Sequence, residues 1–487
     1  MHPGWVLSLV LAACACSGDV GLAGGGGDGG GGDFGATPGG VKDMGFAREL
    51  VANGQVPPAE ALLVEAMFSE HDLGLAGEPC EDALCLRAAS GIAPDREGQS
   101  VGWVQIGLSS GVDPETWQRP STTFVMTVDV SGSMGWEYLD AQYPSPGQIG
   151  REILRGLAGV LTAQDRVAIV TYGSEVAQPL PLTRGDDPDL AEAIEALHEG
   201  GSTDMEGGLR RAYQIARAAA DDGVSEEVRV VLFTDVQPNV GATEPSEFER
   251  MVADGADDGV GITVLAVGLG IGPEVLESMA HRRGANAFSF FQLDDVEEFM
   301  AEEWPWFTSP IAHELSVEVM PAPDLELADA YGFPGAEEGD LGLEVSSVFL
   351  SRRKGALLFS LAGPDLSQLR ADMTLRYRTP AGDEVSAPLT ASYGGEPLDE
   401  AGRYFEQEAT ARAAALALLV SGMKEAAEIY GKSPEQAEAM MRDADERFAA
   451  DAALIDDPTL DPEVDLSRRM LQLVTERAPQ GTLYGLE

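Results

Sequence analysis

Residues 124–135 read FVMTVDVSGSMG, and the organisation of the whole chain can be worked out from this stretch. Residues 124–128 form an uncharged run rich in β-branched side chains, which is typical of a strand buried on both faces of a parallel sheet. In DVSGS, at 129–133, one carboxylate and two hydroxyls alternate with small or apolar residues, and Gly132 permits a sharp turn. Such a turn can direct all three oxygens at one point. Oxygen ligands of this kind suit a hard cation such as Mg²⁺.

The DVSGS segment resembles the metal-ion-dependent adhesion site of von Willebrand factor A (VWA) domains. Two later segments match the other parts of that site in the same order: GGSTD at 200–204, and the aspartate after the strand-like run VRVVLFT at 228–234. The resemblance implies one divalent ion, Mg²⁺ or alternatively Mn²⁺ or Ca²⁺, held by Asp129, Ser131, Ser133, Thr203 and Asp235. In that family the ion keeps an open coordination position, which a Glu or Asp of a protein partner fills.

Each part of this pattern has a simpler interpretation when it is taken singly. Asp235 and Thr203 could cap helices, and Ser131 could be a turn residue. Asp204 is expected to cap the following helix or to support the ligands from behind. Val236 stands where many relatives have Gly, so the loop after Asp235 can differ in shape. Because three ordered segments match together, we expect a metal site.

From residue 122 to about residue 306, strand-like and helix-like segments alternate. The predicted strands are residues 124–128, 165–172, 228–234, 262–267 and 288–291, and the predicted helices are residues 149–161, 188–198, 205–220, 246–254, 273–279 and 294–303. This alternation predicts an α/β fold with a doubly wound, mostly parallel sheet, Rossmann-like as in VWA domains. Ligands bind beyond the carboxyl ends of such strands, where the DVSGS segment lies. We assign residues 121–308 to a VWA domain.

Two regions of different character follow. Residues 309–395 contain short alternating runs separated by Gly and Pro, which predicts antiparallel strands in a β-sandwich. Residues 396–487 form a predicted helical region with helices at 404–423, 434–448 and 466–477. At the start of the second of these helices, Pro434 favours the first turn, and Ser433 with Gln436 fits a capping box.

The first residues predict export from the cytoplasm. Residues 1–13 resemble a signal peptide, because their apolar run is too short to span a bilayer and is followed by small residues. The segment LAAC resembles a bacterial lipobox, which implies that Cys14 is lipidated; the alternative is a generic export signal cleaved nearby. Residues 14–40 would hold the anchor and a flexible Gly-rich tether. We therefore expect a location in the cell envelope, with membrane attachment through the lipid alone.

Residues 41–120 form a predicted N-terminal leader, helical over 41–75 and strand-like at 101–108, as in a small appended unit. The phrase NGQVPP at 53–58 and the segment LRYRTP at 375–380 resemble the leader and the C-terminal extension of a bacterial group of VWA lipoproteins, the YfbK-like group. The resemblance covers nearly the whole mature chain and is strongest in the VWA domain.

Cys80 and Cys85 lie close together in the leader. In an oxidising compartment this spacing favours a local disulfide. A zinc site is the less favoured interpretation, because no further Cys and no neighbouring His would complete the ligand set.

Composition excludes several classes of partner. The chain has 487 residues, 44% hydrophobic and 23% charged, which is typical of a globular protein with more than one domain. Its formal net charge of −51 argues against nucleic acid or an anionic membrane surface as a partner. The sequence contains no nucleophile elbow, P-loop, HExxH motif or dinucleotide fingerprint, and a metal held mainly by hydroxyls activates water poorly.

These observations favour a non-enzymatic, lipid-anchored module that binds a protein partner through a divalent cation. The alternative is a regulatory or scaffold subunit of an envelope complex. An enzyme is the least favoured class.

Overall fold

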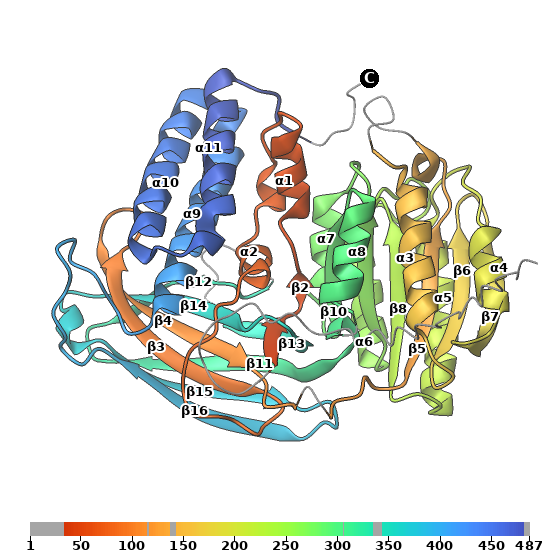
Figure 1. The fold of residues 1–487 in the computed structure, drawn as a ribbon, viewed down its shortest axis with the longest axis horizontal. Helices are drawn as coiled ribbons and strands as arrows, with labels where there is room; N and C mark the ends of the chain where they lie inside the picture. The colour runs from red at the N-terminus through yellow and green to blue at the C-terminus, as the bar shows by residue number, and fades with distance from the viewer. Residues whose placement is uncertain (1–33, 114–115, 137–142, 305, 335–342, 482–487) are drawn as a thin grey trace, which may run out of the picture. The chain divides into compact units, whose positions relative to one another are not determined.

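A seven-stranded sheet of the computed structural model follows the predicted doubly wound pattern (Figure 1). Its strand order is β2-β10-β9-β8-β5-β6-β7, and β7 alone runs antiparallel to its neighbour in this sheet as described. The structure describes residues 34–113, 116–136, 143–304, 306–334 and 343–481. The strands are β2 (Gly40–Val41), β5 (Thr122–Asp129), β6 (Arg166–Tyr172), β7 (Val176–Arg184), β8 (Glu227–Thr234), β9 (Gly261–Val267) and β10 (Ala285–Phe290).

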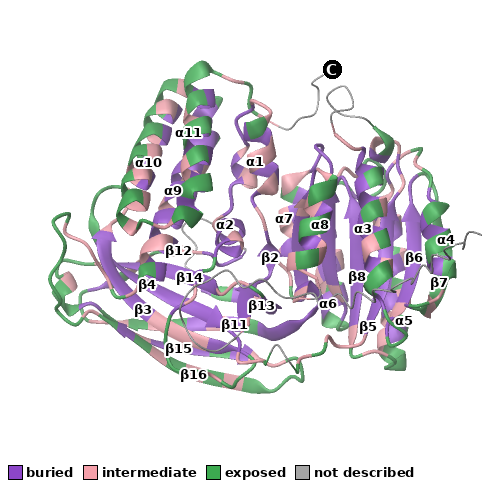
Figure 2. Ribbon diagram, in the orientation of Figure 1, coloured by how far each residue is buried: buried purple, intermediate pink, exposed green. Residues whose placement is uncertain are grey.

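Helices cover both faces of this sheet. Alternate residues of β5 point to opposite faces, and Phe124, Met126 and Val128 share an apolar core with one set of helices, namely α3 (Pro146–Val160), α4 (Asp189–Glu195) and α8 (Leu293–Glu302). Val125 belongs to the core on the other face, which is built with α5 (Met205–Asp222), α6 (Pro245–Asp257) and α7 (Pro273–Ala280). In Figure 2 the central strands are buried, whereas the edge strand β7 and the outer sides of these helices are largely exposed. The predicted α/β fold is confirmed.

A second sheet in the described part of the chain contains ten antiparallel strands. They are β1 (Gly35–Pro38), β3 (Cys85–Pro94), β4 (Ser100–Ser109), β11 (Pro310–Pro321), β12 (Glu326–Tyr331), β13 (Glu344–Ser351), β14 (Gly355–Ala362), β15 (Arg370–Arg378), β16 (Glu384–Ser392) and β17 (Tyr404–Phe405). One group pairs in the order β17-β3-β4-β14-β12 and another in the order β1-β13-β11-β15-β16. β1 joins the two groups, because Gly35 pairs with both Ser351 and Ser109. Apolar side chains of both groups share one core, as in a sandwich.

The N-terminal residues are built into both sheets, which corrects two predictions. The flexible tether is wrong over its last residues, since β1 and Gly40 of β2 are buried strands. The separate leader is also wrong, because β3 and β4 complete the sheet whose other strands come mainly from residues 309–395. Strand pairing between segments more than 200 residues apart leaves no periodic signal in either segment. The predicted signal peptide, Cys14 and residues 15–33 lie outside the described residues.

The C-terminal helices α9 (Glu408–Tyr430), α10 (Pro434–Ile455) and α11 (Asp461–Glu476) confirm the predicted helical region. Two short helices of the leader, α1 (Gly45–Ala52) and α2 (Val64–Glu70), pack against them. Glu463 of α11 joins these parts: its carboxylate accepts hydrogen bonds from Arg48 at 2.9 Å and contacts His71 Nε2 at 3.1 Å. Among the described residues no helix is long and apolar enough to cross a membrane.

α10 begins at Pro434 as predicted, but the predicted capping box is wrong. The Ser433 side chain accepts no cap hydrogen bond. Instead, the Ser433 backbone N–H donates to Ile429 O at 2.8 Å, so this residue belongs to the tight turn that ends α9. A true capping box occurs at the start of α3, between Ser145 and Gln148.

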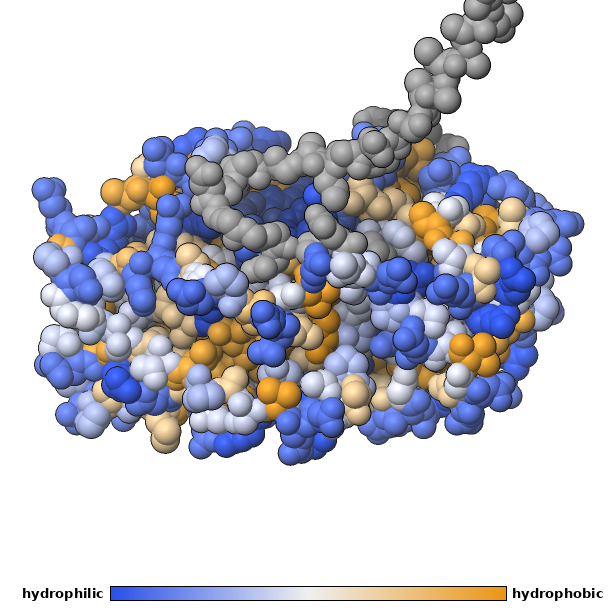
Figure 3. Space-filling view, turned by 60° about the horizontal axis from the view of Figure 1, so that its bottom comes forward, coloured by the Kyte–Doolittle hydropathy of each residue, from blue (hydrophilic) through white to orange (hydrophobic). Residues whose placement is uncertain are grey.

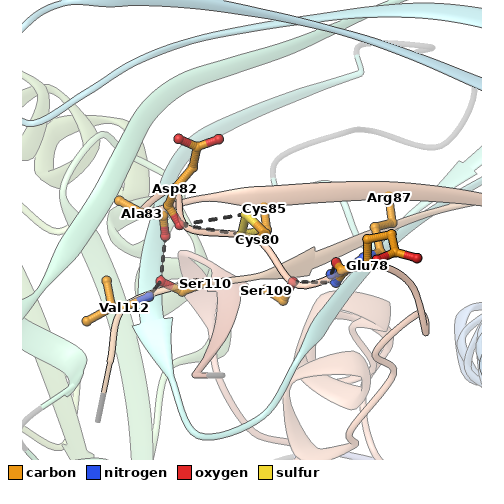
Figure 4. The surroundings of a disulfide bond; sticks show 9 residues. All are labelled: Glu78, Cys80, Asp82, Ala83, Cys85, Arg87, Ser109, Ser110 and Val112. Carbon is orange, nitrogen blue, oxygen red and sulfur yellow. Dashed lines mark hydrogen bonds between the residues drawn. A yellow bond between two sulfur atoms is a disulfide. The ribbon is translucent and has the colours of Figure 1, made fainter. Parts of the chain in front are cut away.

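Cys80 and Cys85 form a disulfide at the entry to β3 (Figure 4), with their Cα atoms 6.1 Å apart. The segment between them is held to the end of β4, since the Ser110 hydroxyl donates to Ala83 O at 2.6 Å. Past the disulfide, Arg87 of β3 donates to the hydroxyl oxygen of Ser109, the last residue of β4, at 3.0 Å. The disulfide therefore closes a short loop that is already held by hydrogen bonds to the neighbouring strand.

The burial of β1 generates a stability prediction. A Cβ added at Gly35 would overlap the carbonyl of Arg353, which is backbone and cannot move aside cheaply. We expect Gly35→Ala to lower the free energy of unfolding by about 2–3 kcal/mol. Gly150→Ala is the matched control, because a Cβ at this position in α3 meets nothing within 4 Å. It should stabilise the protein by up to about 1 kcal/mol. Equal effects of the two changes in urea unfolding would show that β1 is not part of the sheet.

Candidate metal site

Asp129 is the last residue of β5 and pairs across the sheet with Tyr172 of β6. The Ser131 backbone N–H donates to Asp129 Oδ1 at 2.8 Å and so fixes the turn that follows the strand. The hydroxyl oxygens of Ser131 and Ser133 lie 3.1 Å apart. Neighbouring ligands of an octahedral Mg²⁺ ion, with metal–oxygen distances of about 2.1 Å, are separated by about 3.0 Å. The first loop therefore presents two hydroxyls at a spacing that such an ion accepts.

The second predicted segment lies directly against the first. Gly132 N–H donates to Gly201 O at 3.0 Å, and Gly200 N–H donates to Val130 O at 2.7 Å. Gly132 has an ordinary right-handed backbone with φ −62°, so the sharp turn does not require a glycine. The close approach of the two loops favours a glycine, because a Cβ at Gly132 would lie 3.2 Å from Gly201 O and the loops would have to move apart by a few tenths of an ångström. Gly201 itself has φ +89°, where a side chain would overlap Ser174.

The third segment is held to the second by Asn239, which the sequence patterns did not single out. The Thr203 N–H donates to Asn239 Oδ1 at 2.9 Å, and Asn239 Nδ2–H donates to Thr203 Oγ1 at 3.3 Å. The Thr203 carbonyl accepts from the backbone N–H groups of Asn239 and Val240, both at 3.2 Å. Asn239 follows Asp235 by four residues, and nothing in that spacing indicates its contact with Thr203.

Two neighbouring side chains support the site without belonging to the predicted ligand set. Asp204 caps α5, since its Oδ1 accepts from Gly207 N–H at 2.9 Å. Of the two roles expected for Asp204, helix capping and support of the ligands from behind, the structure shows capping. The Thr234 hydroxyl donates to Asp129 Oδ2 at 3.1 Å and accepts from Val236 N–H at 2.9 Å. Asp129 is therefore held through both of its carboxylate oxygens, by Ser131 and by Thr234.

Asp129 and Asp235 are both buried, but among the described residues neither oxygen of Asp235 makes a hydrogen bond of ordinary distance and angle, although the Ser133 hydroxyl and the Gln237 N–H lie nearby. Burial raises the pKa of Asp235 to about 7; the charge of Asp129 adds to the rise, and the nearby Ser133 hydroxyl lowers the pKa in part. Burial also raises the pKa of Asp129, which the bonds from Ser131 and Thr234 offset in part. No described Lys, Arg or His forms an ion pair with either carboxylate. An unpaired buried charge is unfavourable, and a bound cation would remove the penalty for both groups.

The donor set therefore fits a hard divalent ion. It would comprise carboxylates from Asp129 and Asp235 and hydroxyls from Ser131, Ser133 and Thr203, in which oxygen is the sole donor element. Only two of the five are acidic, and no group of three or more His, Cys, Asp or Glu side chains within the described residues is placed to hold a metal ion. The hydroxyls are thus essential to any metal bound here.

Val236, where the sequence differs from many VWA domains, has a left-handed backbone with φ +58°. This conformation is a genuine outlier for a β-branched residue and costs of order 1–3 kcal/mol. The Val236 side chain is buried in the core beside α7, and its N–H is bonded to Thr234. The loop keeps the shape that a glycine would adopt freely, and buried packing of the valine offsets the strain.

Residues 124–237 match the family model of the von Willebrand factor type A domain. This range begins in β5 and ends after Asp235, so it contains all three loops of the site. The chain contains a VWA domain. Domains of this family generally mediate protein–protein interactions and often bind a divalent metal at the site described above.

Two curated relatives share part of the chain. It is 30% identical over 232 residues to the uncharacterized protein YfbK of Escherichia coli (strain K12), covering 45% of this chain and 38% of that protein. It is 24% identical over 198 residues to inter-alpha-trypsin inhibitor heavy chain H4 of Sus scrofa, covering 39% of this chain and 21% of that protein. The chain thus matches well under half the length of each relative.

Among solved structures, the chain resembles a von Willebrand factor type A protein from Catenulispora acidiphila. The TM-score is 0.50 at 12% identity, and the match covers 81% of this chain and 91% of that one. At this identity the likeness shows the fold alone. The match extends beyond the residues assigned to the VWA domain.

The isolated Asp235 carboxylate generates a test of the metal site. Without metal, Asp235→Asn should raise the free energy of unfolding at pH 8 by about 1–3 kcal/mol, because it removes an unpaired buried charge beside Asp129. Since the pKa of Asp235 is raised to about 7, this gain should shrink as the pH falls towards about 4, where the wild-type carboxyl is protonated in the folded protein.

With Mg²⁺ bound, the Asp235 carboxylate should stabilise the fold, whereas without metal it destabilises it. Thermal melts should show a higher Tm with Mg²⁺ than with EDTA for the wild-type protein and no difference for Asp235→Asn. Asp204→Asn is the matched control, because it changes a neighbouring carboxylate that caps a helix, and it should keep the response. An equal response of Asp235→Asn and the wild type would rule out Asp235 as a ligand.

Proposed function

We propose that the chain is a non-enzymatic, extracytoplasmic module that binds a protein partner through a divalent cation, with Mg²⁺ favoured over Mn²⁺ and Ca²⁺. The observation that carries the proposal is the buried Asp235 carboxylate, which makes no hydrogen bond of ordinary geometry and no ion pair within the described part of the chain and lies among three loops that are bonded to one another. A cation bound there would supply the missing positive charge and a coordination position for an oxygen of the partner.

The ligand chemistry supports a partner carboxylate. Three of the five proposed ligands, Ser131, Ser133 and Thr203, are neutral hydroxyls, and the Ser133 side chain is only half-buried. An ion bound mainly by neutral oxygens keeps an affinity for a further anionic ligand. A Glu or Asp side chain of the partner is a suitable ligand.

Exposed apolar side chains flank the three loops. Trp136 directly follows the Ser133–Gly135 turn and is 52% exposed, and Val240 follows Asn239 and is 43% exposed. Large apolar residues at a protein surface are enriched in interfaces, and tryptophan is among the residues that contribute most to binding. These residues support a partner that carries its acidic side chain beside an apolar one.

The net negative charge of the chain does not attract an acidic partner, so the bound ion must supply the attraction. The chain has a formal net charge of −51, and hydrophilic residues are spread over the face seen in Figure 3 between apolar ones. An acidic partner gains no attraction from such a surface at a distance. Association should therefore depend strongly on the cation, and it should persist or improve when salt screens the repulsion.

The proposal predicts metal-dependent capture of a partner. The full chain, immobilised, should retain a protein from an extract of its source in Mg²⁺ and lose it in EDTA, and Asp129→Ala should not retain it in either buffer. Asp187→Ala, which removes a half-buried carboxylate that accepts from Thr183 and from Asp189 N–H at the start of α4, should bind as the wild type does. Once purified, the partner should lose at least ten-fold in affinity when the acidic residue that contacts the ion is changed to its amide.

The competing assignment is a regulatory or scaffold subunit of an envelope complex. It predicts that the same partner is retained in EDTA and by Asp129→Ala. That result would contradict metal-dependent binding and would leave the VWA domain as a docking surface without an ion.

Membrane attachment through Cys14 is part of the proposal and rests on the lipobox-like sequence. Metabolic labelling with an alkyne-bearing fatty acid should label the wild-type chain and not Cys14→Ser. Cys16→Ser is the matched control and should be labelled normally. Equal labelling of the Cys14 variant, or no labelling of the wild type, would favour a generic export signal.

A further inference from the structure

Tyr172 places a buried hydroxyl at the candidate metal site. It ends β6 and pairs across the sheet with Asp129, the last residue of β5, so both side chains point to the same face of the sheet. The Tyr172 side chain is fully buried, and its hydroxyl makes no hydrogen bond of ordinary distance and angle within the described residues. A buried polar group left without a partner costs about 1–3 kcal/mol. A phenylalanine would fill the same space without this cost, so packing alone does not account for the hydroxyl.

The ring of Tyr172 is held in one position by α5. It belongs to the same apolar core as Met205 and Leu209 of that helix. A Cβ added to Gly208 would lie 2.5 Å from the Cδ1 atom of the ring, so the N-terminal part of α5 packs directly on it. Glycine within a helix costs about 0.5–1 kcal/mol relative to alanine, and here it leaves the room that the ring needs. The hydroxyl therefore stays at the carboxyl end of the sheet.

The Tyr172 hydroxyl lies beside the Asp129 carboxylate and the Thr234 hydroxyl. Burial raises the pKa of the phenol well above its usual range, the charge of Asp129 adds to the rise, and the Thr234 hydroxyl opposes it. The neutral phenol is a hydrogen-bond donor, and an ionised carboxylate has about four acceptor sites. The Ser131 N–H and the Thr234 hydroxyl occupy two of the sites on Asp129. Acceptor sites therefore remain for Tyr172 and for a cation.

We infer that Tyr172 is a positioning residue of the metal site: its hydroxyl donates a hydrogen bond to the Asp129 carboxylate and so fixes the direction in which that carboxylate faces a bound divalent cation. The inference rests on the function proposed above, because it requires a cation at the site. Hydrogen bonds to ionised carboxylates are about twice as strong as those between neutral groups. Loss of a group that orients a metal ligand typically lowers metal affinity by about 10–100-fold.

The same hydrogen bond bears on the choice of ion. Mg²⁺ requires near-ideal octahedral geometry, whereas Ca²⁺ accepts a flexible arrangement of oxygen ligands. A carboxylate that is held in one direction suits the first ion, and one that is free to turn suits the second. The Tyr172 hydroxyl should therefore favour Mg²⁺ over Ca²⁺.

Calorimetric titration of the full chain with Mg²⁺ and with Ca²⁺ tests the inference. Tyr172→Phe keeps the ring beneath α5 and removes only the hydroxyl, so it should weaken Mg²⁺ about ten-fold and Ca²⁺ about three-fold or less. Tyr213→Phe is the matched control, because Tyr213 is also a buried tyrosine whose hydroxyl makes no hydrogen bond within the described residues. Its ring packs against Gly255 of α6, and the variant should bind both ions as the wild type does.

The outcomes separate this inference from the proposed function. If the wild type binds neither ion, both are wrong. If the wild type binds Mg²⁺ and Tyr172→Phe binds it equally well, or loses affinity for Mg²⁺ and Ca²⁺ by the same factor, the metal site stands and Tyr172 does not position Asp129. A Tyr172→Phe protein that fails to fold in EDTA, where Tyr213→Phe folds, would also overturn the inference, because the hydroxyl would then serve the fold itself.

Discussion

Two buried carboxylates at the same end of one parallel sheet are the constraint on which the rest of the structure depends. Asp129 ends β5 and Asp235 directly follows β8, the neighbouring strand. Each is buried beside the other, and neither has a basic partner among the described residues. Such a pair is unfavourable unless a cation lies between its members. The hydrogen bonds that join the three loops hold this arrangement in place.

The second sheet is tied to the VWA domain by the N-terminal segment. β1 and β2 are separated by a single residue, yet they belong to different sheets. Lys42 stabilises the crossing, because its buried ammonium donates to Thr37 Oγ1 and to Pro38 O, both at 2.7 Å. The Gly284 N–H adds a direct link by donating to Ser347 Oγ at 2.7 Å. The two sheets thus share one continuous run of backbone near the N-terminus of the described chain, and these hydrogen bonds hold the sheets together there.

Much of the VWA domain and of its candidate site could be predicted because the signals are local. The buried run before Asp129 and the helical spacing of α3 and α5 each lie within one segment, and a parallel sheet brings strand ends to one edge. The edge strands are harder to predict from the sequence. β7 contains Pro179 and Pro181, and β16 contains Pro388, which count against a strand in sequence although an edge tolerates them. Asn239 was missed because its role is a contact with Thr203 in another loop.

The sequence by itself determined the fold class, the order of the VWA elements and the residue types at the candidate metal site, since each follows from side-chain periodicity or from a short run of oxygen donors. Tertiary structure alone decided that residues near position 35 complete a sheet with residues near position 350. It also decided that Gly132 lies in tight contact with Gly201, and that the Asp235 carboxylate has no hydrogen bond of ordinary geometry among the described residues. These are properties of atoms brought together from distant parts of the chain, and no local pattern encodes them.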